Sequence, residues 1–126
     1  MNATTEASTT VDSRNVRLGS APRGATLEFG IAQDRGFEAN AILLLGTQTI
    51  STWVSSELMG KTDTVPLVSS GQYQLQISGK FTTTQETTVQ MTFEIRGDAG
   101  SIIARSKSFT GKRGGIARAI ADVFVP

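Results

Sequence analysis

Apolar and polar residues alternate along much of this chain, which is the pattern of strands that bury one face. Leu27, Phe29 and Ile31 alternate with polar or small neighbours, as expected for a half-buried strand. The apolar run 42–45 is typical of a strand that is covered on both faces. Residues 47–56 are rich in Thr, Ile, Trp and Val, which favour strands. The first half of the chain therefore predicts a β-rich fold.

The clearest alternation lies in two segments, 71–81 and 88–96. Their apolar positions are Tyr73, Leu75, Ile77, Phe81, Val89, Met91, Phe93 and Ile95. A polar connector at 82–87 separates them, so we predict that the two strands pair as a β-hairpin. A slip of one residue in register would expose every apolar side chain, so the pairing should be strongly specified.

The last segment, 116–125, fits two patterns. A helix would gather one apolar set on a single face: Ile116, Ile120, Val123 and Phe124. A strand would gather another set: Ala117, Ala119, Ala121, Val123 and Val125. The β-prone end of the segment favours the strand. With about seven short strands and Gly-rich turns, the predicted fold is all-β, an antiparallel β-sandwich or jelly-roll-like domain. A short C-terminal helix stays as the alternative for 116–125.

Composition divides the chain into two parts. Residues 1–20 predict a flexible Ser/Thr-rich N-terminal tail, because a segment so poor in large apolar side chains buries little surface. Val16 and Leu18 are the first residues that could anchor it. Residues 21–126 predict a single β-sandwich domain, long enough to form its own core.

The absence of cysteine and histidine excludes several kinds of chemistry. Disulfides, thiolate nucleophiles, serine triads and zinc sites built on Cys or His all need one of these residues. The acidic residues are scattered and no spacing pairs two of them across a cleft, as a glycosidase would require. We therefore expect no enzyme active site, no metal and no cofactor.

No targeting or membrane segment is expected. The first residues lack a basic stretch followed by an apolar run, so we see no secretory signal. The longest strongly apolar run, Ala41 to Leu45, is far shorter than the roughly 20 residues of a spanning helix. The compartment stays open, although a structural role would suit a virion or a cell surface.

Uncharged polar faces are the main candidate binding surfaces. Gln72, Gln74 and Gln76 alternate with the apolar positions of one strand, as do Thr88, Gln90 and Thr92 in the next. Because these side chains carry no charge, such a face causes little electrostatic repulsion, and it can pack against another sheet or bind a sugar. Trp53 is the only tryptophan; exposed, it could stack on a sugar ring, and otherwise it is a core or interface anchor, as we expect for Tyr73.

A basic stretch near the end of the chain is the candidate site for an anionic polymer. It spans 105–118 and has no acidic residue: Arg105, Lys107, Lys112, Arg113 and Arg118. These residues could hold phosphates, or they could form a solvated hairpin, which the net charge of only +1 favours. Arg96-Gly97-Asp98 has the letters of an adhesion tripeptide, but turn chemistry explains Gly97 and Asp98 equally well.

Taken together, these features predict a non-enzymatic structural or assembly protein. It would be a self-associating β domain, such as a virion or surface-structure component, and would form homo-oligomers. The alternative is a carbohydrate-binding or adhesion module, in which Trp53 and the glutamines would contact a glycan.

Overall fold

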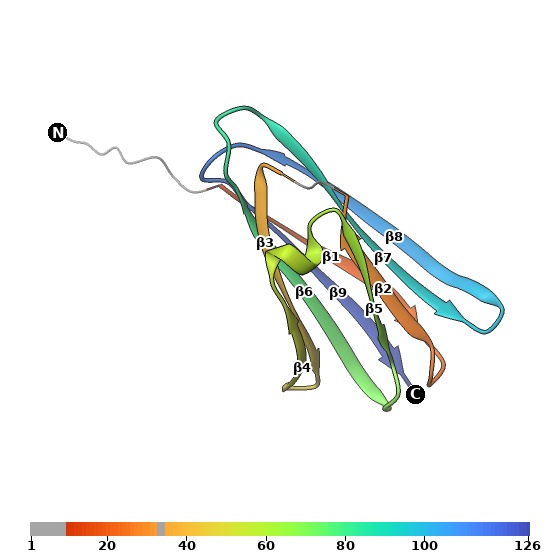
Figure 1. Ribbon diagram of the computed structural model, residues 1–126. Coiled ribbons are helices and arrows are strands. Elements are labelled where there is room, and N and C mark those ends of the chain that lie inside the picture. Colours follow the sequence, from red (N-terminus) through yellow and green to blue (C-terminus); the bar gives the residue numbers. More distant parts are fainter. Residues whose placement is uncertain (1–9, 33–34) are drawn as a thin grey trace.

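The computed structural model describes residues 10–32 and 35–126, which form two β-sheets packed face to face (Figure 1). The five-stranded sheet has the order β1 (Val11–Ser20), β9 (Ile116–Val125), β6 (Gly71–Phe81), β3 (Phe37–Leu45) and β4 (Gln48–Trp53). The four-stranded sheet has the order β5 (Lys61–Pro66), β2 (Thr26–Ile31), β7 (Thr87–Gly97) and β8 (Gly100–Gly111). The prediction of an all-β sandwich is confirmed.

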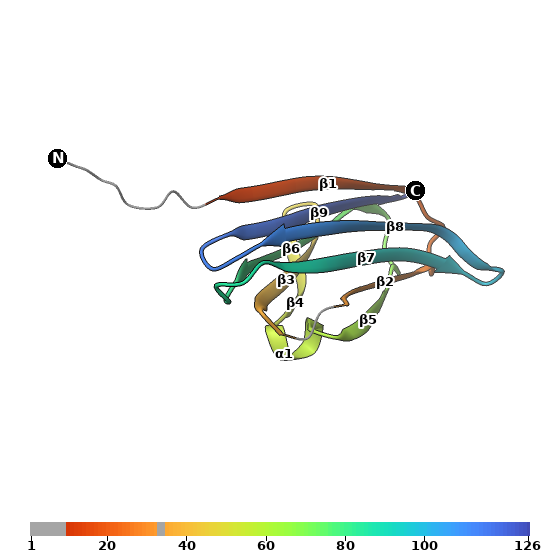
Figure 2. The same ribbon diagram turned by 90° about the horizontal axis from the view of Figure 1, so that it is seen from above.

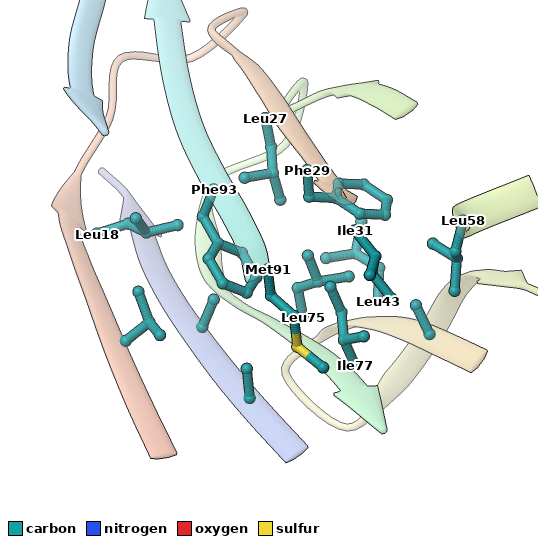
Figure 3. Close-up of a cluster of buried hydrophobic side chains, with 14 of the residues drawn as sticks. Leu18, Leu27, Phe29, Ile31, Leu43, Leu58, Leu75, Ile77, Met91 and Phe93 are labelled. Carbon is teal, nitrogen blue, oxygen red and sulfur yellow. The ribbon is translucent and has the colours of Figure 1, made fainter. Parts of the chain in front are cut away.

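The core lies between the two sheets and holds the apolar side of each predicted alternation. Figure 3 shows side chains of both sheets meeting there, among them Leu75 and Ile77 from β6 and Met91 and Phe93 from β7. These side chains are almost fully buried, and each contributes about 1.5–3 kcal/mol by leaving water.

The predicted hairpin between 71–81 and 88–96 is wrong. β6 pairs with β3 and β9 in the five-stranded sheet, whereas β7 pairs with β2 and β8 in the four-stranded sheet. The two strands face each other across the core, and the polar connector passes from one sheet to the other. Alternation specifies which face of a strand is buried, and both arrangements bury the same faces.

The predicted tail is also wrong for residues 11–20, which form β1, while residues 1–9 lie outside the described part. β1 pairs in parallel with β9, whereas the other described pairs of the five-stranded sheet are antiparallel. Val16 and Leu18 are 2% and 1% exposed, so the two anchors expected from the sequence do pack into the core. The backbone N–H and C=O groups of residues 11–20 form hydrogen bonds with the edge of β9, and these bonds order a segment that has few apolar side chains of its own.

Residues 116–125 form a strand, as favoured, and the alternative of a C-terminal helix is wrong. β9 lies between β1 and β6, with its alanines and valines inward and Phe124 outward. The helix that the structure does show is α1 (Ser55–Leu58), a single turn between β4 and β5.

Each sheet ends in two strands that have only one neighbour. These edge strands are β1 and β4 in one sheet and β5 and β8 in the other. β1 and β8 are the edge strands at one margin of the sandwich (Figure 2), where the Arg14 guanidinium lies 5.2 Å from the centre of the Phe109 ring. At the opposite margin, α1 joins β4 to β5. Within the described residues, no helix has the length and apolarity needed to cross a membrane.

Candidate functional surfaces

The outer face of the five-stranded sheet, hereafter face A, brings the predicted glutamines together at its centre. Gln74 donates a hydrogen bond through its amide nitrogen to Asp122 Oδ1 at 3.1 Å, and Gln76 donates one to Gln74 Oε1 at 2.6 Å. Gln72 extends the row along β6 and lies opposite Phe124. The glutamine side chains therefore satisfy much of their hydrogen-bonding capacity within the face.

Large apolar side chains occur on several strands of the five-stranded sheet outside this glutamine row. Three of them are strongly exposed: Phe124 at 44%, Ile50 at 42% and Val11 at 51%. Four more are half-buried between the polar positions of face A: Ile42, Leu44, Ile116 and Ile120. The sequence did not single these out, because the pairing of β9 in the middle of the sheet is what aligns them with β6. Face A thus presents apolar surface around an internally bonded polar centre.

Face A is hollowed where β4 ends and the chain leaves the edge of β3. This hollow has a volume of about 700 Å³. Its lining combines hydroxyl, amide, charged and apolar groups, including Asn40, Ser55, Ser78, Lys80 and Val54. Ser55 is held beside β3 in this lining, because its Oγ accepts a hydrogen bond from the Ala39 backbone N–H at 3.1 Å.

The outer face of the four-stranded sheet, hereafter face B, has a different chemistry. One row across all four strands contains only small residues: Thr62, Gly30, Thr92 and Ser106. Another pair of hydroxyls, Thr88 and Thr110, lies 2.8 Å apart. The predicted set Thr88, Gln90 and Thr92 therefore lies on the side of the molecule opposite Gln72, Gln74 and Gln76. The alternation of Ser and Thr in 106–110 was the signal for this face that sequence reasoning missed.

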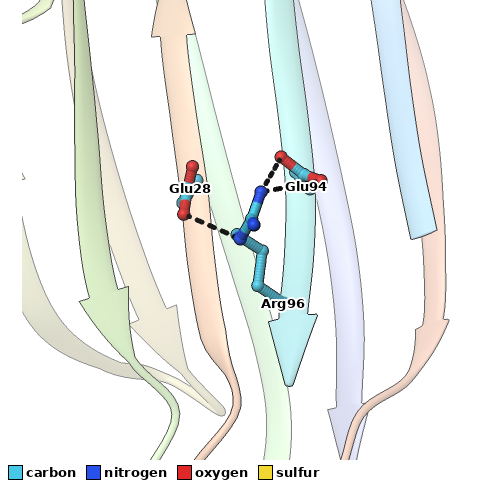
Figure 4. A network of polar contacts seen from close by, with 3 residues as sticks. All are labelled: Glu28, Glu94 and Arg96. Atoms are coloured by element: carbon cyan, nitrogen blue, oxygen red, sulfur yellow. Dashed lines mark hydrogen bonds and ion pairs between the residues drawn. The ribbon is translucent and has the colours of Figure 1, made fainter. Parts of the chain in front are cut away.

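Two carboxylates and one guanidinium form the charged part of face B (Figure 4). Glu28 and Glu94 lie directly opposite each other on β2 and β7. Arg96 bridges them, with Nε 3.5 Å from Glu28 Oε2 and Nη1 3.3 Å from Glu94 Oε1. A hydrogen bond from the Ser101 hydroxyl lowers the pKa of Glu94, and Arg96 adds to this effect. Arg96 of the adhesion-like tripeptide is thus engaged within the sheet.

A shallow hollow of about 350 Å³ lies beside these carboxylates. Its polar lining comprises Glu28, Glu94, Gln90, Thr62, Thr92 and Ser106, and Phe29, Phe93, Ala104 and Arg105 complete it. It offers carboxylates, hydroxyls, one amide and one guanidinium, and its two phenylalanine rings are buried.

Trp53 does not belong to either outer face. Its side chain is half-buried at the end of β4 and packs against Phe29 edge to face, with ring centres 4.8 Å apart and planes at 80°. Tyr73 is buried, and its hydroxyl donates a hydrogen bond to the Ser69 carbonyl at 2.9 Å. Both aromatic residues act as anchors within the sandwich, and Trp53 is separated from the glutamines with which it was grouped.

The basic stretch does not form one patch. Arg105 and Lys107 lie on the inner side of the edge strand β8, in register with the buried Phe93 and Met91. Lys112 and Arg113 occupy the turn between β8 and β9, where Arg113 Nε donates a hydrogen bond to the Thr82 carbonyl at 3.2 Å. The hollow at this end of the molecule is also lined by Asp12 and Glu86, so both signs of charge meet there.

Arg118, the last residue of that stretch, lies on face A opposite Ser78. The structure therefore distributes the predicted polyanion site over three separate places. A continuous basic surface for a nucleic acid does not result from this arrangement.

Asp63 is an inward-facing carboxylate on the edge strand β5. It lies opposite Phe29, and its Oδ2 atom is buried with no hydrogen-bond partner among residues 10–32 and 35–126. Burial raises the pKa of Asp63, and the nearby Glu57 raises it further, while Lys61 opposes both effects. No group of three or more acidic residues in the described part of the chain could hold a metal ion.

In comparisons with known proteins, no family model, curated protein or solved structure matches this chain.

Proposed function

We propose that this protein is a structural, self-associating β-sandwich and that two copies join through face A. The observation that supports this proposal is the set of exposed apolar side chains, Val11, Ile50 and Phe124, on the same sheet as the bonded glutamine row. Large exposed aliphatic and aromatic side chains are typical of the core of an interface.

The size of face A suits a stable dimer. Strands of about ten residues rise about 3.3 Å per residue, and five strands spaced about 4.8 Å apart give a face of about 600–800 Å². A standard interface buries about 800 Å² on each partner. Two such faces can stack as sheets do in a sandwich, with a spacing of about 10 Å.

The charges of face A are compatible with self-pairing. Arg17 lies opposite Asp122, and Lys80 lies opposite Glu38 at an ion-pair distance of 4.0 Å. Both signs occur close together, so a two-fold contact of the face with itself need not oppose like charges.

Sedimentation velocity over a hundredfold range of concentration tests this proposal. We expect Phe124→Ser to weaken the dimer about tenfold or more, because it removes a large apolar side chain from the interface. The matched control is Val68→Ser, which changes an exposed apolar residue in the connection between β5 and β6 and should leave the dimer unchanged. A wild-type monomer at every concentration, or equal effects of both variants, would contradict the proposal.

We propose carbohydrate binding by face B as the alternative function. The hollow lined by Glu28, Gln90, Thr92 and Ser106 supports it, since carboxylates, amides and hydroxyls are the groups that bind sugar hydroxyls. In this arrangement Trp53 takes no part, because it packs against Phe29 inside the sandwich.

A further inference from the structure

The two edges of the four-stranded sheet carry opposite charges at the ends of one cross-strand row. This row runs across the sheet from β5 to β8 through Asp63, Phe29, Phe93 and Arg105. The two phenylalanines are buried, so the register places Asp63 and Arg105 on the inner side of the sheet, while the exposed Arg105 side chain also reaches the lining of the hollow on face B. A charged residue on the inner side of an edge strand cannot be fully covered by its own sheet.

Neither residue forms an ion pair within its own copy of the described chain, although Lys61 lies near enough to Asp63 to lower its pKa. Asp63 Oδ2 has no hydrogen-bond partner there, and burial raises the pKa of this carboxyl. The Arg105 guanidinium donates one hydrogen bond, to the Ala104 carbonyl at 3.3 Å, and no carboxylate among residues 10–32 and 35–126 lies within ion-pair distance of it. A buried or half-buried carboxylate gains most from a cationic partner.

We propose that copies of this protein also associate edge to edge, with β8 of one copy pairing with β5 of the next so that Arg105 lies opposite the neighbour's Asp63. This inference rests on the proposed self-association and adds a second contact to it. β5 and β8 point in opposite directions within the sheet, because each adjacent pair is antiparallel. A neighbour displaced sideways therefore continues the sheet as one more antiparallel pair.

The adjoining row supports the same register. It runs through Val65, Leu27, Ile95 and Ile103, and its two end residues are apolar and only partly buried. Continuing the sheet would place Val65 beside the neighbour's Ile103 and complete their burial. One charged pair and one apolar pair thus meet in a single register.

The same register also contains an unfavourable pair. Lys61 lies two residues from Asp63, and Lys107 lies two residues from Arg105, so the two lysines would face each other. The contact should therefore be weak in the natural protein and stronger after Lys107→Glu. Because it joins two different edges, it cannot form a closed two-fold dimer, and it instead builds a chain of copies or a ring of several.

Charge reversal on the full-length chain tests this contact, with sedimentation velocity at low salt and electron microscopy as readouts. We expect Asp63→Arg alone, or Arg105→Asp alone, to weaken edge association about tenfold or more, because like charges then meet. A mixture of the two single variants should restore edge association, because an acidic edge of one variant then meets a basic edge of the other. The double variant should also restore it, because each copy again has one acidic and one basic edge. The control is Asp98→Arg, in the turn between β7 and β8.

Several results would overturn the inference. If the mixture associates no better than either single variant, the two residues do not meet. If the single reversals strengthen association, Asp63 and Arg105 instead protect the edges from pairing. Asp63→Asn keeps the size of the side chain, so its loss of edge association, with circular dichroism unchanged, separates this contact from misfolding. Phe124→Ser should still form edge contacts, so failure of face A and failure of the edges are distinguishable.

Discussion

Face A and face B are the outer surfaces of the same sandwich, yet they are built from different residues. Both sheets place alternate apolar side chains in one core, and the strands differ mainly in what they direct outward. Face A directs outward Phe124, Ile120 and the glutamines, whereas face B directs outward hydroxyls and the Glu28–Glu94 pair. The inward residues determine the fold, and the outward residues determine how each surface can interact.

The hydrogen-bonding groups of the two faces also differ in how they are used. On face A, the glutamines bond to one another and to Asp122, which leaves the apolar side chains as the groups that gain most by being covered. On face B, hydroxyls and carboxylates border a hollow and stay available to solvent or to a polar ligand. The first chemistry suits a second copy of the chain, and the second suits water or a sugar.

The largest expected effect on stability concerns Gly30 on face B, where the backbones of β2 and β5 approach closely. A Cβ atom at Gly30 would lie 2.1 Å from the Lys61 carbonyl oxygen, so Gly30→Val must displace β5 from β2. We expect it to lower the free energy of unfolding by about 3 kcal/mol or more in urea denaturation. Gln76→Val, at the centre of face A, should change it by less than about 1 kcal/mol. Equal effects of the two substitutions would contradict this difference between the faces.

A smaller effect concerns the charges of face B. Arg96→Ala leaves Glu28 opposite Glu94 with no cation between them, and we expect the melting temperature to fall by about 2–5 °C at pH 7. The pKa of Glu94 is lowered from its ordinary value of 4.5, so its ionised form stabilises the native protein above that pH.

That contribution is lost as the pH falls below 4.5 through the lowered pKa of Glu94. The difference between Arg96→Ala and the natural protein should therefore shrink on acidification, which thermal denaturation at a series of pH values measures. A difference that stays constant down to about pH 3 would show that Arg96 acts through packing instead.

The smallest expected effect is sugar binding at face B. If the alternative function holds, calorimetric titration should give a dissociation constant of about 1 mM, which is weak because the hollow lacks a stacking ring. Gln90→Ala should abolish the heat of binding, whereas the fluorescence of Trp53 should not change when sugar is added. Quenching of Trp53 would place the sugar elsewhere, and heat that survives Gln90→Ala would exclude this hollow.

Sequence reasoning identified the inner residues of this fold better than the neighbours of each strand. The alternation at Leu75 and Phe93 predicts burial correctly, because a strand with one apolar face has only one way to hide it. It does not determine whether β6 and β7 pair within a sheet or face each other across the core. Such pairing depends on residues far apart in the chain.

The candidate site was predictable only in part, for the same reason. Gln74 and Gln76 are recognisable as an uncharged outer face from their spacing on one strand. Phe124 joins them only because β9 pairs with β6, and Arg105 separates from Arg118 because β8 and β9 belong to different sheets. Asp63 is unremarkable in the sequence, and its unpaired oxygen becomes visible only when the edge of the sheet is known.

The parallel pairing of β1 with β9 has a consequence for synthesis of the chain on the ribosome. β1 is translated before the other described strands, and among these it pairs with the last one, about 100 residues later. The five-stranded sheet therefore cannot be completed until β9 has left the exit tunnel, while β6, β3 and β4 wait with one edge open. Several copies synthesised on one messenger RNA would expose the open edge of β6 close to one another. This favours pairing between chains unless chaperones bind the edges first.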